Sequence, residues 1–93
     1  MDGMPGDDIV EPVRIAASGV NGVLAVEKLT ARKAGLVYYV DIHVQADAAM
    51  TLHDAHELSG AVKSAIRAAA PQVRGVLIHM EPFESPVTAG SRG

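Results

Sequence analysis

The chain of 93 residues contains no cysteine. This absence excludes disulfide bridges, thiolate metal sites and a cysteine nucleophile, and it is compatible with a reducing compartment. Aromatic residues make up only 3% of the sequence, so it lacks the stacking platforms that bind single-stranded nucleic acid. The formal net charge of -3 gives no basic field that would attract a phosphate backbone. We therefore expect no nucleic-acid partner.

Long hydrophobic runs are also missing. No apolar stretch approaches the ~20 residues that a membrane helix needs, and the acidic start Met1–Asp8, with its Gly and Pro, does not have the pattern of a signal peptide. We expect no direct membrane insertion. Hydrophobic residues nevertheless make up 48% of the chain, and nearly all of them are aliphatic. The core of one small domain built from them is thin, and dimerisation is a common remedy.

The hydrophobic spacing predicts two helices and three strands. In chain order these are helix 8–18, strand 22–31, strand 36–46, helix 51–70 and strand 74–81, with a hairpin turn at 32–35. The order αββαβ predicts an α+β, ferredoxin-like sandwich with two helices on one face of a three-stranded sheet. We take residues 8–83 as the domain and expect residues 1–7 and 84–93, rich in Gly, Pro, Ser and Asp, to be disordered ends.

The candidate functional residues follow from strand alternation. Side chains at every second position share a face, so His43, His79 and Glu81 are expected on the face that the helices leave uncovered. Glu27 on the first strand can lie on the same uncovered face. Two imidazoles and one carboxylate suit zinc first, and also Fe(II), Mn(II), Co(II) or Ni(II). The sequence therefore predicts an open metal site that water or another chain would complete.

A plainer interpretation of these histidines stays open. A strand histidine that faces solvent is usually just a tolerated polar residue. His53 and His56 lie three residues apart on the long helix and could bracket a metal, but His53 and Glu57 also have the i, i+4 spacing of an ordinary surface pair. Leu29 and Leu77 would be apolar side chains without partners on the uncovered face, which indicates a dimer interface there.

Five stretches in a fixed order resemble the cytoplasmic C-terminal domain of cation diffusion facilitator transporters. They lie within Val20 to Pro82, about two thirds of the chain. They are Gly22-Val23-Leu24-Ala25-Val26, Leu29-Thr30-Ala31-Arg32-Lys33-Ala34-Gly35, Val40-Asp41-Ile42-His43, Ala55-His56 and Val76-Leu77-Ile78-His79-Met80-Glu81-Pro82.

The resemblance implies a metallochaperone-like fold, a cytoplasmic location and a V-shaped homodimer with no enzymatic activity. It implies divalent cation binding near the subunit interface through His43, His79 and Glu81, with His56 contributing from the same or the partner chain. Metal binding in this family is linked to closing of the dimer, which regulates export by the attached membrane domain.

Two departures from the family pattern bear on the site. Family members commonly carry His where Glu27 stands, in a His-Asp-Leu element that Glu27-Lys28-Leu29 replaces here. With an oxygen ligand or no ligand at position 27 in place of an imidazole, the range of metals that the site could bind is wider. The sequence contains no transmembrane domain, so we expect either a stand-alone relative, which we favour, or an excised piece of a cation efflux transporter. The alternatives are a ferredoxin-like protein-interaction module that binds no metal, and a small metal-dependent enzyme, for which the sequence offers no dedicated base.

Overall fold

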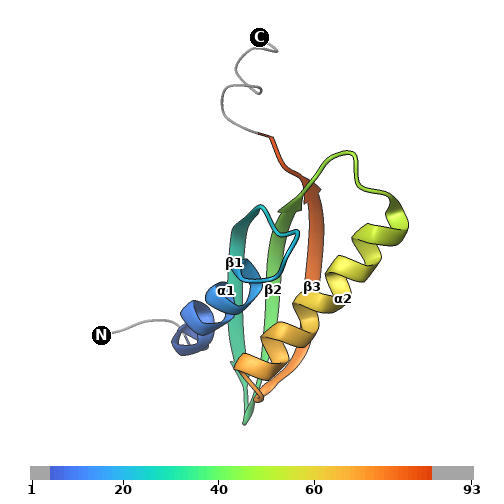
Figure 1. Ribbon diagram of the computed structural model, residues 1–93. Coiled ribbons are helices and arrows are strands. Elements are labelled where there is room, and N and C mark those ends of the chain that lie inside the picture. The colour runs from blue at the N-terminus through green and yellow to red at the C-terminus, as the bar shows by residue number, and fades with distance from the viewer. Residues whose placement is uncertain (1–4, 85–93) are drawn as a thin grey trace.

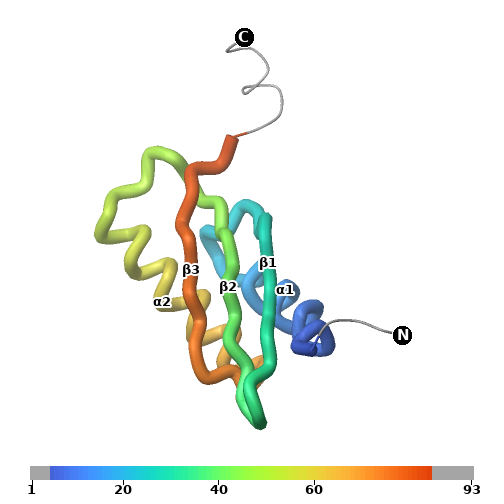
Figure 2. The backbone as a smooth tube through the Cα atoms, turned by 180° about the vertical axis from the view of Figure 1, so that it is seen from behind, coloured from blue at the N-terminus to red at the C-terminus, as the bar shows by residue number. Residues whose placement is uncertain are grey.

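The computed structural model describes residues 5–84. The elements are η1 (Asp7–Ile9, a 3-10 helix), α1 (Val10–Ser18), β1 (Ala25–Ala34), β2 (Val37–Ala46), α2 (Leu52–Ala69) and β3 (Val73–Pro82). The strands form one sheet in the order β1-β2-β3, in which β2 pairs antiparallel with β1 and parallel with β3. Both helices cover one face of the sheet (Figure 1), and the other face is uncovered when seen from behind (Figure 2). The predicted αββαβ sandwich is confirmed.

The central strand β2 shows how the sequence produces these two faces. Its side chains alternate, and Tyr38, Val40, Ile42 and Val44 are all buried beneath the helices. They pack against Val13 and Ala17 of α1 and against Leu58, Val62 and Ile66 of α2. Within residues 5–84 every buried core residue is hydrophobic, and no buried residue is polar or charged. The covered face is therefore a purely apolar layer.

Helix α2 begins as its sequence predicts. The Thr51 hydroxyl accepts a hydrogen bond from the Asp54 backbone N–H at 3.0 Å, which satisfies one of the donors that a helix N-terminus leaves unpaired. The apolar spacing predicts a buried stripe of Leu52, Ala55, Val62, Ile66 and Ala69. The buried residues are instead Leu58, Val62 and Ile66, and Leu52 is 90% exposed. Ten residues at ~100° each rotate Leu52 about 80° away from Val62, so the two side chains do not share a face.

The hairpin between β1 and β2 is tighter than the predicted turn at 32–35. Ala34 pairs with Val37, so only Gly35 and Leu36 lie in the loop. Gly35 has φ 65°, which is the left-handed region that the first central position of a type II′ turn requires. Arg32 and Lys33 therefore belong to β1 and not to the turn.

The chain before α1 packs closely against the sheet. Gly6 is buried with φ 109°, and a Cβ there would lie 2.5 Å from the Ala31 carbonyl oxygen. Ile9 enters the core at 3% exposure, and the Tyr38 hydroxyl donates a hydrogen bond to Asp8 Oδ2 at 2.9 Å. Of the ends that the sequence assigns to tails, residues 1–4 and 85–93 lie outside the described residues.

Candidate metal centre

The two strand histidines lie side by side on the uncovered face. His43 of β2 and His79 of β3 are register partners in the parallel pair. Their imidazole rings stack with centroids 4.3 Å apart and planes 13° from parallel. The alternation of residues along each strand predicts that His43 and His79 share a face, and the pairing of β2 with β3 brings them next to each other.

Each histidine also meets a carboxylate from the neighbouring strand. His43 Nδ1 lies 2.5 Å from Glu81 Oε2, and His79 Nε2 lies 3.7 Å from Asp41 Oδ1. An ionised carboxylate only accepts hydrogen bonds, so Nδ1–H of His43 donates to Glu81. In the neutral ring this leaves Nε2 with the lone pair that a metal ion needs, and Glu81 then orients the ring as carboxylates commonly do at metal sites.

Asp41 is a site residue that the sequence pattern alone does not predict. It shares the alternation of His43, two positions away on β2, but it comes close to His79 only because β3 lies parallel to β2. Half of its side chain is exposed, as is nearly half of that of His79. Asp41 therefore adds a second carboxylate to the candidate site.

A β-bulge places Glu27 on the same face. Val26 pairs with Val44 and Leu29 pairs with Ile42, so Glu27 and Lys28 together oppose His43. The bulge also changes the expected position of Leu29. In a regular strand Leu29 would share the face of Glu27, whereas here it packs against the core cluster. Leu29 therefore does not lie on the uncovered face, where it was expected as an interface residue.

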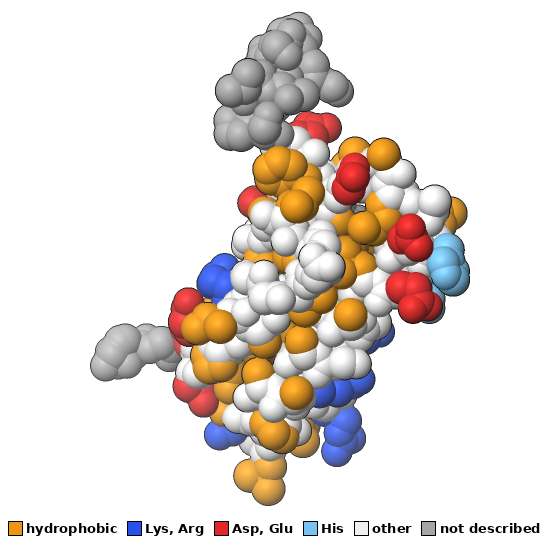
Figure 3. Space-filling model, in the orientation of Figure 1, with side chains coloured by type: hydrophobic (Ala, Val, Ile, Leu, Met, Phe, Trp, Pro, Cys, Tyr) orange, Lys and Arg blue, Asp and Glu red, His pale blue; other side chains and the backbone are white. Residues whose placement is uncertain are grey.

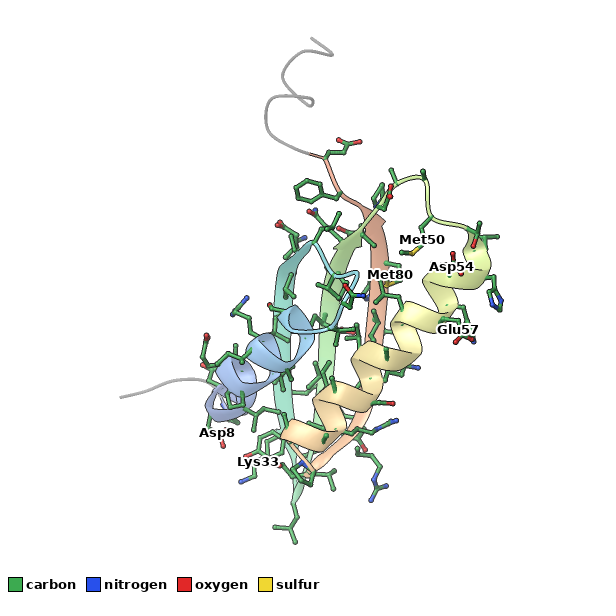
Figure 4. The ribbon with its side chains drawn as sticks, in the orientation of Figure 1. Asp8, Lys33, Met50, Asp54, Glu57 and Met80 are labelled. Atoms are coloured by element: carbon green, nitrogen blue, oxygen red, sulfur yellow. The ribbon has the colours of Figure 1, made fainter. Side chains whose placement is uncertain are left out.

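His56 lies on the other side of the molecule. It is exposed on α2, the helix that covers the opposite face of the sheet. Histidine and acidic side chains gather over the N-terminal part of this helix in Figure 3, where Figure 4 labels Asp54 and Glu57. Within one chain, the structure does not bring His56 or His53 to the strand residues.

Next to the histidines, the uncovered face has a shallow hollow of about 530 Å³. The Arg32 guanidinium lies 4.7 Å from the centre of the Tyr39 ring, and this ring covers Gly75, where a Cβ would lie 3.0 Å from it. Leu77 lines the same hollow and is 57% exposed. The exposed Leu77 thus fits the expectation of an apolar side chain on this face, although no interface is present in the single chain.

The donor atoms of the site are imidazole nitrogens and carboxylate oxygens, which suit metal ions of intermediate softness. Two imidazoles and a carboxylate match zinc and its first-row neighbours, and they match calcium or magnesium poorly because those ions prefer all-oxygen shells. Among the side chains of residues 5–84, however, no three His, Asp or Glu groups are close enough together to hold an ion. The His43–Glu81 contact would have to open, or ligands from another molecule would have to join, for a complete shell to form.

The sequence of this domain matches the family model described as "Cation efflux protein, cytoplasmic domain" over residues 5–83. The chain belongs to this family. The family is a cytoplasmic domain of transporters rather than a class of enzymes. In the described part of this member, no helix is long and apolar enough to cross a membrane.

Two curated relatives of this cation efflux domain are plant proteins. Metal tolerance protein C1 of Arabidopsis thaliana is 34% identical over 73 residues, which is 78% of this chain and 16% of the plant protein. Metal tolerance protein 2 of Oryza sativa subsp. japonica is 28% identical over 80 residues, which is 86% of this chain and 21% of the plant protein. The chain thus spans about a fifth or less of the length of these relatives.

Solved structures of the MamM CTD share the fold of this cation efflux domain. One has a TM-score of 0.80 and 28% identity, and the match covers 84% of this chain and 96% of that chain. A nickel form and a cadmium form of MamM CTD variants each have a TM-score of 0.80 and 26% identity, with the same 84% of this chain covered and 99% and 98% of theirs. The αββαβ fold is therefore that of the cation efflux cytoplasmic domains.

Proposed function

We propose that this domain binds a divalent transition-metal ion on the uncovered sheet face and homodimerises, and that metal binding regulates a cation efflux transporter. The observation that carries the proposal is the stacked pair His43 and His79 beside the Glu81 carboxylate. Neutral imidazole and carboxylate are common ligands of zinc and of neighbouring first-row ions. The nickel and cadmium forms of the MamM CTD support a divalent cation as the ligand.

The ligands assigned are His43, His79 and, once its contact with His43 opens, Glu81, with Glu27 and Asp41 on the same face as further oxygen donors. Two imidazoles and one carboxylate leave a position open in a tetrahedral shell. A second copy of the chain would fill it and thereby couple metal binding to the geometry of the dimer. His56, exposed on α2, is accessible to such a copy, and the exposed Leu77 provides apolar area next to the site.

Calorimetric titration of the metal-free protein with Zn, Mn, Co, Ni and Fe(II) tests the proposal. We expect zinc binding at pH 7.5, and weaker binding at pH 5.5 because imidazoles must be unprotonated to ligate. His79→Ala should reduce affinity by a factor on the order of 10–100, the size of loss that even indirect changes at metal sites produce. His53→Ala is the matched control, because it removes an imidazole from α2 and should bind as the parent does.

Two results would contradict the proposal. One is a parent protein that binds none of the five ions, which would favour an interaction module that binds no metal. The other is equal affinity of parent and His79→Ala, which would place any bound ion elsewhere. Sedimentation with and without zinc tests the dimer separately, and a 9.7 kDa monomer at micromolar concentration under both conditions would argue against it.

A further inference from the structure

The bulge in β1 presents two residues of opposite charge to the histidine pair. Val26 before the bulge and Leu29 after it both pack against the core, so the two residues between them both lie on the uncovered face. A regular strand would turn one of two consecutive residues toward the helices. Here Glu27 and Lys28 are both exposed and both oppose His43.

The Lys28 side chain forms no ion pair among residues 5–84. Two of the three carboxylates of the candidate site contact imidazoles, Glu81 that of His43 and Asp41 that of His79. In the same described range, the Lys28 side chain makes no hydrogen bond either. Its ammonium group is therefore in contact with no carboxylate, and it lies on the same face as the place where a divalent cation would bind.

We infer that Lys28, placed opposite His43 by the β1 bulge, lowers the affinity of this face for divalent cations and makes that affinity depend on ionic strength. The inference rests on the proposed metal site at His43 and His79. Glu27 and Lys28 act in opposite directions, one attracting the ion and the other repelling it. The bulge thus sets the affinity of the site below the value that its imidazoles and carboxylates alone would give.

The expected size of the effect follows from Coulomb's law. Opposed residues of neighbouring antiparallel strands have Cβ atoms about 5 Å apart, so the ammonium can approach an ion on His43 to about 8 Å. At that separation in water, repulsion between the singly charged ammonium and the doubly charged ion weakens binding roughly fivefold. Screening shortens the range of this repulsion to about 3 Å at 1 M salt, so the effect should fade as salt is added.

Zinc titrations of the parent, Lys28→Gln and Lys28→Glu at low and high sodium chloride test the inference. At about 0.01 M salt we expect Lys28→Gln to bind roughly fivefold tighter than the parent and Lys28→Glu tighter still. At 1 M salt the difference between parent and Lys28→Gln should fall below about twofold. Lys33→Gln is the matched control: it removes the same charge from the hairpin end of β1, about 17 Å further along the strand, and should leave affinity nearly unchanged.

The outcomes separate this inference from the proposed function. If the parent binds zinc and both Lys28 variants bind it equally well, Lys28 has no such role and the metal site stands. If Lys28→Gln and Lys33→Gln increase affinity by the same factor, the effect belongs to net charge and the inference is wrong. If neither the parent nor any variant binds zinc, the proposed metal site and the inference fail together.

Discussion

The two faces of the sheet are built from the same three strands but carry opposite chemistry. On the covered face, β2 contributes Ile42 and Val44, which are fully buried. On the uncovered face, the residue between them is His43, whose ring is about a quarter exposed and touches a histidine and a carboxylate. One step along the chain therefore moves from the part of the molecule that stabilises the fold to the part that can bind a ligand. Stability and function should respond separately to substitutions on the two faces.

The largest effect is expected at Ile42. Replacing Ile42 with Ala leaves a cavity in a fully buried apolar layer and should lower the free energy of unfolding by about 2–5 kcal/mol. The neighbouring change His43→Ala removes a partly exposed ring and one polar contact and should cost about 1 kcal/mol or less. Urea denaturation measures both. Equal losses for the two variants would show that the faces do not divide stability from function as described.

The next largest effect is expected at Gly6, in the segment that precedes the first helix. Gly6→Ala forces a Cβ into the Ala31 backbone at a positive φ and should destabilise the domain by about 1–3 kcal/mol. Gly60→Ala is the matched control, because nothing lies within 4 Å of a Cβ there and Gly60 is in the middle of α2. It should stabilise the fold by about 0.5–1 kcal/mol. Thermal unfolding of both variants checks the contrast, and a Gly6→Ala protein as stable as the parent would contradict it.

The smallest effect is expected for the hydrogen bond between Tyr38 and Asp8. This bond lies where the N-terminal segment meets the hairpin end of the sheet, near the labelled Asp8 and Lys33 in Figure 4. The hydrogen bond to Asp8 raises the pKa of Tyr38, with burial and the repulsion of the carboxylate adding to it. A raised folded-state pKa means that this contribution to stability is complete below the ordinary value near 10 and is lost as the pH rises through the folded value.

Asp8→Asn should therefore lower the pKa of Tyr38 toward the ordinary value of a tyrosine. Titration of phenolate absorbance measures this, with Glu11→Gln as the control because Glu11 contacts Arg14 instead. The parent should also lose stability above pH 10 more steeply than the Asp8→Asn variant does. A Tyr38 pKa that is the same in both proteins would show that Asp8 does not hold the proton on Tyr38.

Gly60 in α2 is not explained by close packing. A glycine in the middle of a helix suggests close packing against a neighbour, yet within residues 5–84 no atom beyond the adjoining helix backbone lies within 4 Å of the Cβ position. Leu52 is a second case, since an apolar residue at a helix start is easily counted into the buried stripe, although it is 90% exposed. The error at Gly60 arises because periodicity gives the direction of a side chain on its own helix and not what lies opposite it. At Leu52 the helical spacing itself, about 80° from Val62, excludes the residue from the stripe.

The alternation of apolar and polar residues was sufficient to predict the αββαβ order, the two helices on one face, and the shared face of His43, His79 and Glu81. These features are local, because side-chain direction in a strand has a period of two and a right-handed helix has a period near 3.6. Thr51 as the cap of α2 is likewise a property of a few neighbouring residues. For such features, the order of residue types along the chain is enough.

Only the tertiary structure determined the register of β1. A regular strand and a bulged strand have the same sequence pattern, and they differ in which residues meet β2. The bulge at Glu27 and Lys28 turns Leu29 into the core and places a lysine opposite His43. The parallel pairing of β2 and β3 brings Asp41 to His79 in the same way. Pairing between strands is a non-local choice, decided by which register buries the most apolar area, and no single segment of the sequence contains it.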